Sequence, residues 1–280
     1  MAPNVDYVFN RDFLDINRWS YLPMFATGSM NLLHHFWTKT LCYVIPPNIP
    51  RDGIRRVADV GTGTAIWLFD AREHLPDDAQ LVGFDISFDA APPREVLPSN
   101  VRLQHWDARE AIPDGLERSF DVIHLRFLAF VLLNDEIPGV ISRLFQMLKP
   151  GGYIQWDEAD METLRFDKAR TESKTENLEA LYRLLEARDP RLKPTWANHL
   201  PELFSEAGFV DVEKDTKDAP QQVAFQFHDV GLIIHELIAR KLQDEQMASE
   251  LRRLLPAAVA ETKNAAYRTS LRFSVIARKP

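Results

Sequence analysis

Residues 56–65 read Arg-Val-Ala-Asp-Val-Gly-Thr-Gly-Thr-Ala, and this stretch decides the fold of the chain. A short apolar run precedes two glycines, Gly61 and Gly63, and such a run predicts a buried parallel strand that ends in a tight turn. Glycine suits that turn because it tolerates positive φ and lets a ligand approach the backbone closely. The stretch therefore predicts a strand followed by a ligand-binding turn.

The residues that follow complete a strand–helix–strand unit. Residues 65–75 carry apolar side chains at helical spacing, and residues 80–84 form a second apolar run that ends at Asp85. A carboxylate at that position, about twenty residues past the turn, is placed to accept hydrogen bonds from ribose hydroxyls. We therefore expect one βαβ unit that binds a nucleoside.

Two ligand classes fit such a unit, a nicotinamide or flavin dinucleotide and S-adenosylmethionine. A dinucleotide favours G-x-G-x-x-G, but the third glycine position is Ile66 here. Asp59, two residues before Gly61, would repel a diphosphate but could hold an ammonium group directly or through water. An ammonium, a ribose at Asp85 and no phosphate describe S-adenosylmethionine.

Three more strands are predicted after this unit, over residues 100–106, 119–125 and 153–156. Asp107 follows the first of them and could hydrogen-bond the exocyclic amine of a bound adenine, with Ala108 offering its backbone N–H to the ring. Ile86 could pack on the adenine face. Leu125 ends the next strand and completes the predicted cofactor contacts.

The remaining pattern indicates helices and two late strands. Past Arg126 we expect a helix through about residue 133, and Glu158 is expected just beyond the fifth strand. Amphipathic spacing and turn residues predict helices over 136–148, 171–185, 199–207, 225–240 and 247–255, and strands over 210–213 and 269–277.

Four motifs stand in the order and spacing of class I S-adenosylmethionine-dependent methyltransferases, which the chain resembles. They are Asp-Val-Gly-Thr-Gly-Thr (59–64), Gly-Phe-Asp-Ile-Ser (83–87), Ser-Phe-Asp-Val-Ile-His (119–124) and Leu-Lys-Pro-Gly-Gly-Tyr-Ile-Gln-Trp-Asp-Glu (148–158). The resemblance implies an α/β, Rossmann-like fold, with a mostly parallel seven-stranded sheet closed by an antiparallel C-terminal hairpin. The Tyr-Ile-Gln-Trp-x-Glu ending and Asn31-x-x-His34 are similar to fungal methyltransferases of secondary-metabolite clusters.

The chain divides into three expected parts: a helical lid segment (1–50), a cofactor-binding core (51–160), and a helical insertion that also completes the sheet (161–280). The lid is rich in aromatic residues that could line a small-molecule pocket. We place Tyr21, His35, Trp37 and Arg126 in that pocket. His34 and His35 are adjacent on a helix, so at most one of them should enter it.

Methyl transfer is an in-line displacement that mainly requires near-attack geometry in a water-poor cleft. A general base helps a hydroxyl or a protonated amine, whereas a thiolate or free amine needs little help. We take His34 and Glu158 as the catalytic candidates. Four other histidines, His35, His199, His228 and His235, are weaker candidates that could equally be structural. Whether oxygen, nitrogen or sulfur accepts the methyl group stays open.

Composition limits the partners. The net charge is −8 and the pI is about 5.5, which argues against a nucleic-acid backbone as partner. The one cysteine, Cys42, excludes an internal disulfide and shows no metal-site spacing, so no metal is expected. No signal peptide or membrane-spanning run is visible, so we expect a cytoplasmic protein that acts on a small molecule. Exposed apolar helices near the N-terminus would suit a homodimer.

Three alternatives remain beside the small-molecule methyltransferase. A metal-assisted catechol-type enzyme would rest only on Asp157, Glu158 and Asp160. A dinucleotide-dependent oxidoreductase is disfavoured by Ile66 and Asp59. The third is a methyltransferase-like regulator of secondary metabolism that acts through protein partners, because fungal regulators share this fold.

Overall fold

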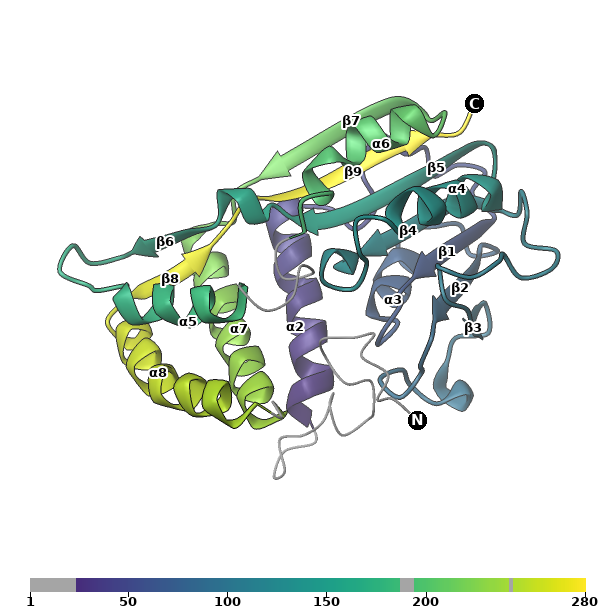
Figure 1. The fold of residues 1–280 in the computed structure, drawn as a ribbon. Helices are drawn as coiled ribbons and strands as arrows, with labels where there is room; N and C mark the ends of the chain where they lie inside the picture. The colour runs from purple at the N-terminus through teal and green to yellow at the C-terminus, as the bar shows by residue number, and fades with distance from the viewer. Residues whose placement is uncertain (1–23, 187–193, 242–243) are drawn as a thin grey trace.

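The computed structural model describes residues 24–186, 194–241 and 244–280. Its centre is a seven-stranded sheet in the order β3-β2-β1-β4-β5-β9-β7 (Figure 1). The strands are β1 (Arg56–Val60), β2 (Gln80–Asp85), β3 (Val101–His105), β4 (Phe120–Arg126), β5 (Leu148–Ala159), β7 (Val210–Lys217) and β9 (Arg272–Arg278).

The first five strands pair in parallel, whereas β9 runs antiparallel to both β5 and β7. The predicted Rossmann-like sheet with an antiparallel C-terminal pair is therefore confirmed. The chain order reverses at β1, with β2 on one side and β4 on the other, and open α/β sheets bind ligands at the carboxyl ends of the strands beside such a switch point.

Helices cover both faces of the sheet because its parallel strands are buried on both sides. One apolar cluster joins the sheet to α4 (Ile137–Met147) and α6 (Leu200–Glu206). A second joins the opposite face to α3 (Ile66–Arg72). In α4 the buried side chains recur at helical spacing, as predicted from the amphipathic pattern.

A helical cap lies beside the sheet, and α2 (Met24–Leu41) stands between cap and sheet (Figure 1). The cap holds α5 (Glu176–Glu186), α7 (Gln221–Lys241), α8 (Glu245–Lys263) and a two-stranded sheet of β6 (Arg165–Lys168) and β8 (Ala266–Thr269). The sequence predicted these helices but not the small sheet, because each of its strands has only four residues. Short 3-10 turns are η1 (Arg94–Val96), η2 (Leu128–Phe130), η3 (Met161–Thr163) and η5 (Ala197–His199).

Two local predictions are wrong. The helix expected after Arg126 is only η2, because Phe127 takes a left-handed conformation (φ 61°) and the Glu158 side chain accepts from the next two N–H groups. Glu158 itself lies within β5 and is 0% exposed, rather than beyond the strand. Within the described residues, no helix is both long and apolar enough to cross a membrane.

Candidate functional site

The glycine turn lies at the carboxyl end of β1, where Gly61 and Gly63 have φ of +73° and +54°. Its N–H groups are used inside the protein. Gly61 and Thr62 both donate to the carbonyl of Phe84, at 2.8 and 3.0 Å, and Gly63 donates to Asp85 Oδ2 at 2.9 Å. These three N–H groups therefore do not form an open anion-binding nest of the kind that holds a diphosphate.

Asp59 does not project from the strand end but lies buried beneath the turn. Its Oδ2 accepts from the Thr62 hydroxyl at 2.7 Å, and its Oδ1 lies 2.7 Å from Nδ1 of His124. The other ring nitrogen of His124 lies 3.3 Å from Asp157 Oδ2, so one imidazole bridges two buried carboxylates from β1 and β5. The ring of Trp67 stacks on that of His124, with 3.9 Å between the ring centroids and an interplanar angle of 1°.

This acid–imidazole–acid row was missed in the sequence analysis. The parallel register places Asp59 beside His124, and His124 beside Gln155, which is two residues before Asp157. The three members of the row therefore meet only after β1, β4 and β5 pair. The row fixes Asp59 and, through Thr62, the glycine turn.

Asp85 ends β2 next to that turn and is half-buried. It accepts from the backbone N–H groups of Gly63, Ile86 and Ser87 at 2.8–3.2 Å. Burial raises the pKa of this carboxyl, while the three N–H donors oppose that rise. The side chain is held in one orientation with part of its surface accessible, as a ribose-binding carboxylate requires.

The other predicted cofactor contacts differ in what they can offer. Both carboxylate oxygens of Asp107 are engaged by the Arg109 side chain at 2.7–3.2 Å, so an adenine amine would share them. Ile86 is half-buried, whereas Ala108 is only 9% exposed. Leu125 is fully buried in the core, so only its backbone can line the site.

Glu158 supports the loop beyond β4. Its Oε1 accepts from the N–H groups of Leu128 and Ala129 and from Trp156 Nε1, at 2.8–3.0 Å. Its Oε2 is buried without a hydrogen-bond partner. Burial raises the pKa of Glu158 to about 8, which keeps the group protonated at neutral pH. Leu128 in turn lies against Gly61, 3.0 Å from where a Cβ would stand.

His34 and Arg126 meet at the end of β4. His34 Nε2 lies 2.9 Å from Asp70 Oδ2, and Arg126 Nη2 lies 2.9 Å from His34 Nδ1. Burial and the neighbouring Arg126 lower the pKa of His34 to about 4. The ring is therefore neutral, with its proton on Nε2 and its Nδ1 lone pair accepting from Arg126.

Of the four predicted pocket residues, Arg126 belongs to this pair and Trp37 contacts it. Arg126 lies over the rings of Trp37 and Phe127, at 5.9 and 5.5 Å from their centroids. His35 is exposed, so of the two adjacent histidines only His34 turns inward. Tyr21 lies outside the described residues.

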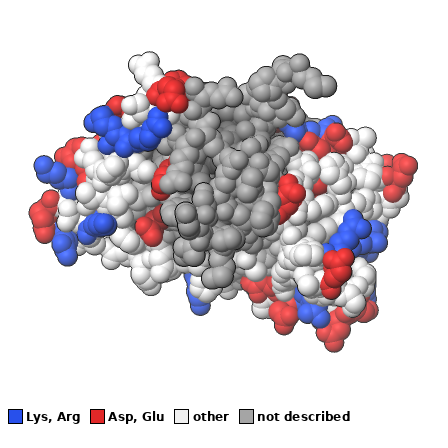
Figure 2. All heavy atoms as spheres, turned by 90° about the horizontal axis from the view of Figure 1, so that it is seen from below, with Lys and Arg blue, Asp and Glu red and all other residues white. Residues whose placement is uncertain are grey.

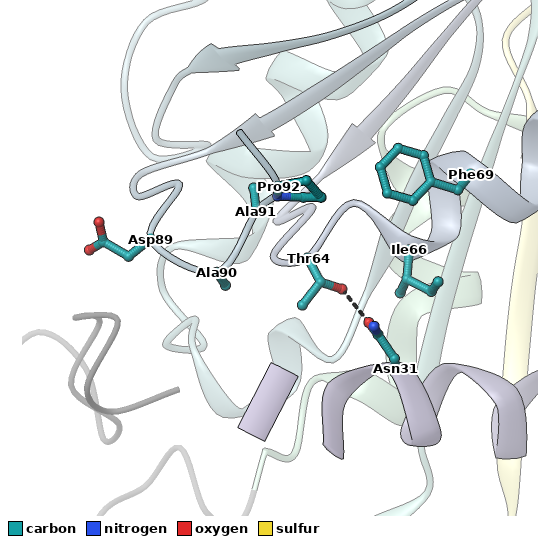
Figure 3. A pocket seen from close by; sticks show the side chains of 8 residues that line it. All are labelled: Asn31, Thr64, Ile66, Phe69, Asp89, Ala90, Ala91 and Pro92. Carbon is teal, nitrogen blue, oxygen red and sulfur yellow. Dashed lines mark hydrogen bonds between the residues drawn. The ribbon is translucent and has the colours of Figure 1, made fainter. Parts of the chain in front are cut away.

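A pocket of about 230 Å³ opens beside the glycine turn (Figure 3). Asn31 of α2 and Thr64 of the turn form one wall, joined by a 2.8 Å hydrogen bond, and Ile66 and Phe69 of α3 form another. Residues 89–92, which follow Asp85, close the far side. Helix α2 thus borders the glycine turn.

In the described part of the chain, we find no grouped metal ligands, and the visible face carries mixed charge. Among residues 24–186, 194–241 and 244–280, no three His, Cys, Asp or Glu side chains are grouped to hold a metal ion. Figure 2 shows Lys and Arg interspersed with Asp and Glu on the described part of the visible face, with no basic stripe.

The comparisons with known proteins concern mainly the core of the chain. A family model described as a methyltransferase domain matches residues 57–152, which run from β1 into β5. The methyltransferase grgD of a Penicillium species is 33% identical over 115 residues, which cover 39% of this chain and 40% of grgD. The secondary metabolism regulator laeA of Fusarium oxysporum f. sp. lycopersici is 27% identical over 244 residues, which cover 80% of this chain and 75% of laeA.

A solved structure shares the fold. It is phosphoethanolamine N-methyltransferase 2 of Haemonchus contortus, in complex with phosphomonomethylethanolamine and S-adenosylhomocysteine. The TM-score is 0.52 at 18% identity, over 96% of this chain and 60% of that chain. The likeness at this identity concerns the fold, and the matched part of this chain spans less than half the length of grgD.

Proposed function

Because the core of this chain is a class I methyltransferase domain, we propose that the protein transfers a methyl group from S-adenosylmethionine to a small-molecule acceptor. Asp85 would hold the ribose hydroxyls, and the turn from Gly61 to Gly63 would lie under the methionine part. Asp107, Ala108 and Ile86 would surround the adenine.

The arrangement of carboxylates at the glycine turn supports this cofactor over a dinucleotide. Three of the turn's N–H groups already have partners within the protein, and one of these is the Asp85 carboxylate. A diphosphate would meet negative charge where it needs donors. S-adenosylmethionine carries a positive sulfur and an ammonium group, which suit the same surroundings.

When bound, S-adenosylmethionine supplies a methyl group on a positively charged sulfur, an excellent leaving group. The protein then has to position the acceptor and exclude water. Glu158 would contribute by holding η2 against the glycine turn. His34 remains our candidate base, since it is neutral and its Nδ1 lone pair would be available once Arg126 turned to an acceptor.

The observation that carries the proposal is the fixed carboxylate of Asp85, so its removal is the test. We expect Asp85→Ala to weaken S-adenosylhomocysteine binding, measured by calorimetric titration, by roughly 10- to 100-fold, the value of lost hydrogen bonds to a charged group. Asp78→Ala is the matched control, because Asp78 is exposed just before the opposite end of β2. Equal binding by both variants would contradict the assignment.

A second candidate is a methyltransferase-like regulator that acts through protein partners. It is favoured by the laeA alignment, which covers 80% of this chain and so includes the cap as well as the core. Incubation with labelled S-adenosylmethionine and a fungal metabolite extract separates the two functions. Label in a small product supports the enzyme, and label only on protein, or none, supports the regulator.

A further inference from the structure

Two guanidinium groups lie where the cap meets the main sheet, on Arg268 of β8 and on Arg272 at the start of β9, and neither has a carboxylate partner among the described residues. Arg268 donates only to the hydroxyl of Tyr182 and the sulfur of Met161, at 3.2 and 3.7 Å, and its Nε is buried without a partner. Arg272 is 5% exposed and donates to the carbonyl of Ser270. Within the described part of the chain, no Asp or Glu oxygen lies within ion-pair distance of either.

Aromatic rings offset part of this charge. Arg268 lies 4.6 Å from the ring centroid of Tyr182, and Arg272 lies 3.8 Å from that of Phe227. Such cation–π contacts are worth much less than the cost of leaving a buried charge without a counter-ion. Among the described residues, Asp218 favours the charged form of Arg272 but is itself ion-paired with Arg165, so the positive centre is only partly compensated in a protein whose net charge is −8.

Two buried histidines border the same centre. The His235 ring packs on Tyr182 at 4.3 Å, and its Nδ1 donates to the carbonyl of Gly231. His228 Nε2 lies 2.8 Å from the Thr262 hydroxyl, which itself donates to Ala258. His228 must then be the donor in that pair, so its Nδ1 carries no proton and, being buried, has no partner.

Both histidines are neutral. Burial, with Arg268 nearby, lowers the pKa of His228 to about 3 and that of His235 to about 4. Neutral rings cannot supply the negative charge that the two arginines lack. Their bare nitrogens instead accept hydrogen bonds, so the complementary group is an anion with an O–H or N–H donor on or beside it.

The cluster faces the reaction edge of the sheet. Met161 begins η3 directly beyond β5, and Arg268 contacts its sulfur. On the other side, Phe227 under Arg272 lies 6.4 Å from the ring of Trp37, which lies beneath Arg126. A row of rings and cations thus connects the cap cluster with the end of β4.

We propose that Arg268 and Arg272, together with Tyr182, His228 and His235, form an anion-binding site that holds a carboxylate or phosphate group of the acceptor. That this ligand is the methyl acceptor rests on the proposed function, whereas anion binding by the cluster does not.

The test is calorimetric titration of the full-length protein with inorganic phosphate and, separately, with acetate, at ionic strength held constant with chloride. We expect saturable binding of at least one of them, and the stronger of the two identifies the phosphate or carboxylate class. Arg268→Gln should weaken it at least about tenfold, the effect of one lost charge-assisted contact. Arg253→Gln is the matched control, since Arg253 is ion-paired with Glu250 at an exposed position of α8, and this variant should bind within about twofold of wild type.

Binding of neither anion, or equal weakening by the two variants, overturns the proposal. If Arg268→Gln does not fold, Arg272→Gln provides the same comparison. S-adenosylhomocysteine is titrated into the same samples. Anion binding without nucleoside binding would refute the proposed function alone, and the reverse result would refute the anion site alone.

Discussion

Replacing Glu158 by glutamine should change how the stability of the protein depends on pH. The carboxyl is fully buried, and burial raises its pKa from the ordinary 4.5 to about 8. Between these values the folded protein keeps a proton that the unfolded chain has released. The free energy of unfolding therefore decreases as pH rises through this window, because the folded state binds more protons than the unfolded state.

The size of the effect follows from one proton. Each pH unit in this window lowers the free energy of unfolding by about 1.4 kcal/mol, so that of wild type should fall by about 2.5 kcal/mol between pH 5.5 and 7.5 through this group. Glutamine has nearly the shape of the protonated acid, and its carbonyl oxygen can still accept from Leu128, Ala129 and Trp156. Glu158→Gln should therefore lack this slope while retaining the loop.

Urea unfolding of wild type and Glu158→Gln across pH 5.5–8.5 measures the difference directly. Contributions from His34, His228, His235 and Asp85 are common to both proteins and cancel. Glu117→Gln, at an exposed position, controls for the change in net charge. Parallel stability curves for wild type and Glu158→Gln would refute the reasoning. Glu158→Ala should lose stability at every pH, since three donors lose their acceptor.

Three further predictions concern the same site. His124→Ala removes the imidazole that the buried carboxylates of Asp59 and Asp157 share, and urea unfolding should show a loss of about 3–5 kcal/mol in the free energy of unfolding; a loss below about 1 kcal/mol would argue against the bridge. Gly63→Ala places an L-residue at φ +54° and should lower the free energy of unfolding by about 1–2 kcal/mol. The new Cβ would also lie 2.7 Å from the terminal methyl carbon of Met30, so Met30→Ala serves as a background that removes this contact. Much of the loss should persist in that background, and full rescue would contradict the backbone explanation. The free energy of unfolding of wild type should fall by up to about 3 kcal/mol through His34 as pH falls from 6.5 to 4, because the ring takes up a proton in the unfolded chain but stays neutral in the folded protein. In the same assay, the stability of His34→Gln should depend less steeply on pH over this acidic range.

Local sequence was sufficient for the elements that position the site. The apolar run before Gly61 and Gly63 predicts β1 and its turn, since only a buried strand and a positive-φ turn suit those residues. The acid after the next apolar run was correctly placed at the end of β2. Family resemblance added the seven-stranded order with its antiparallel last strands, which residue patterns alone left open.

Tertiary structure decided what each polar side chain does. Asp59 was expected to face a ligand, but the pairing of β1 with β4 brings His124 within 2.7 Å of it. Glu158 was expected just beyond the fifth strand, but it lies within β5 and is buried beside η2. Sequence by itself determined β1, its glycine turn and the acid that ends β2, because these depend on hydrophobic spacing and backbone preference within a few residues. Protonation and hydrogen-bond partners were decided only by tertiary structure, because they depend on contacts between residues about 30 to 65 positions apart in the chain.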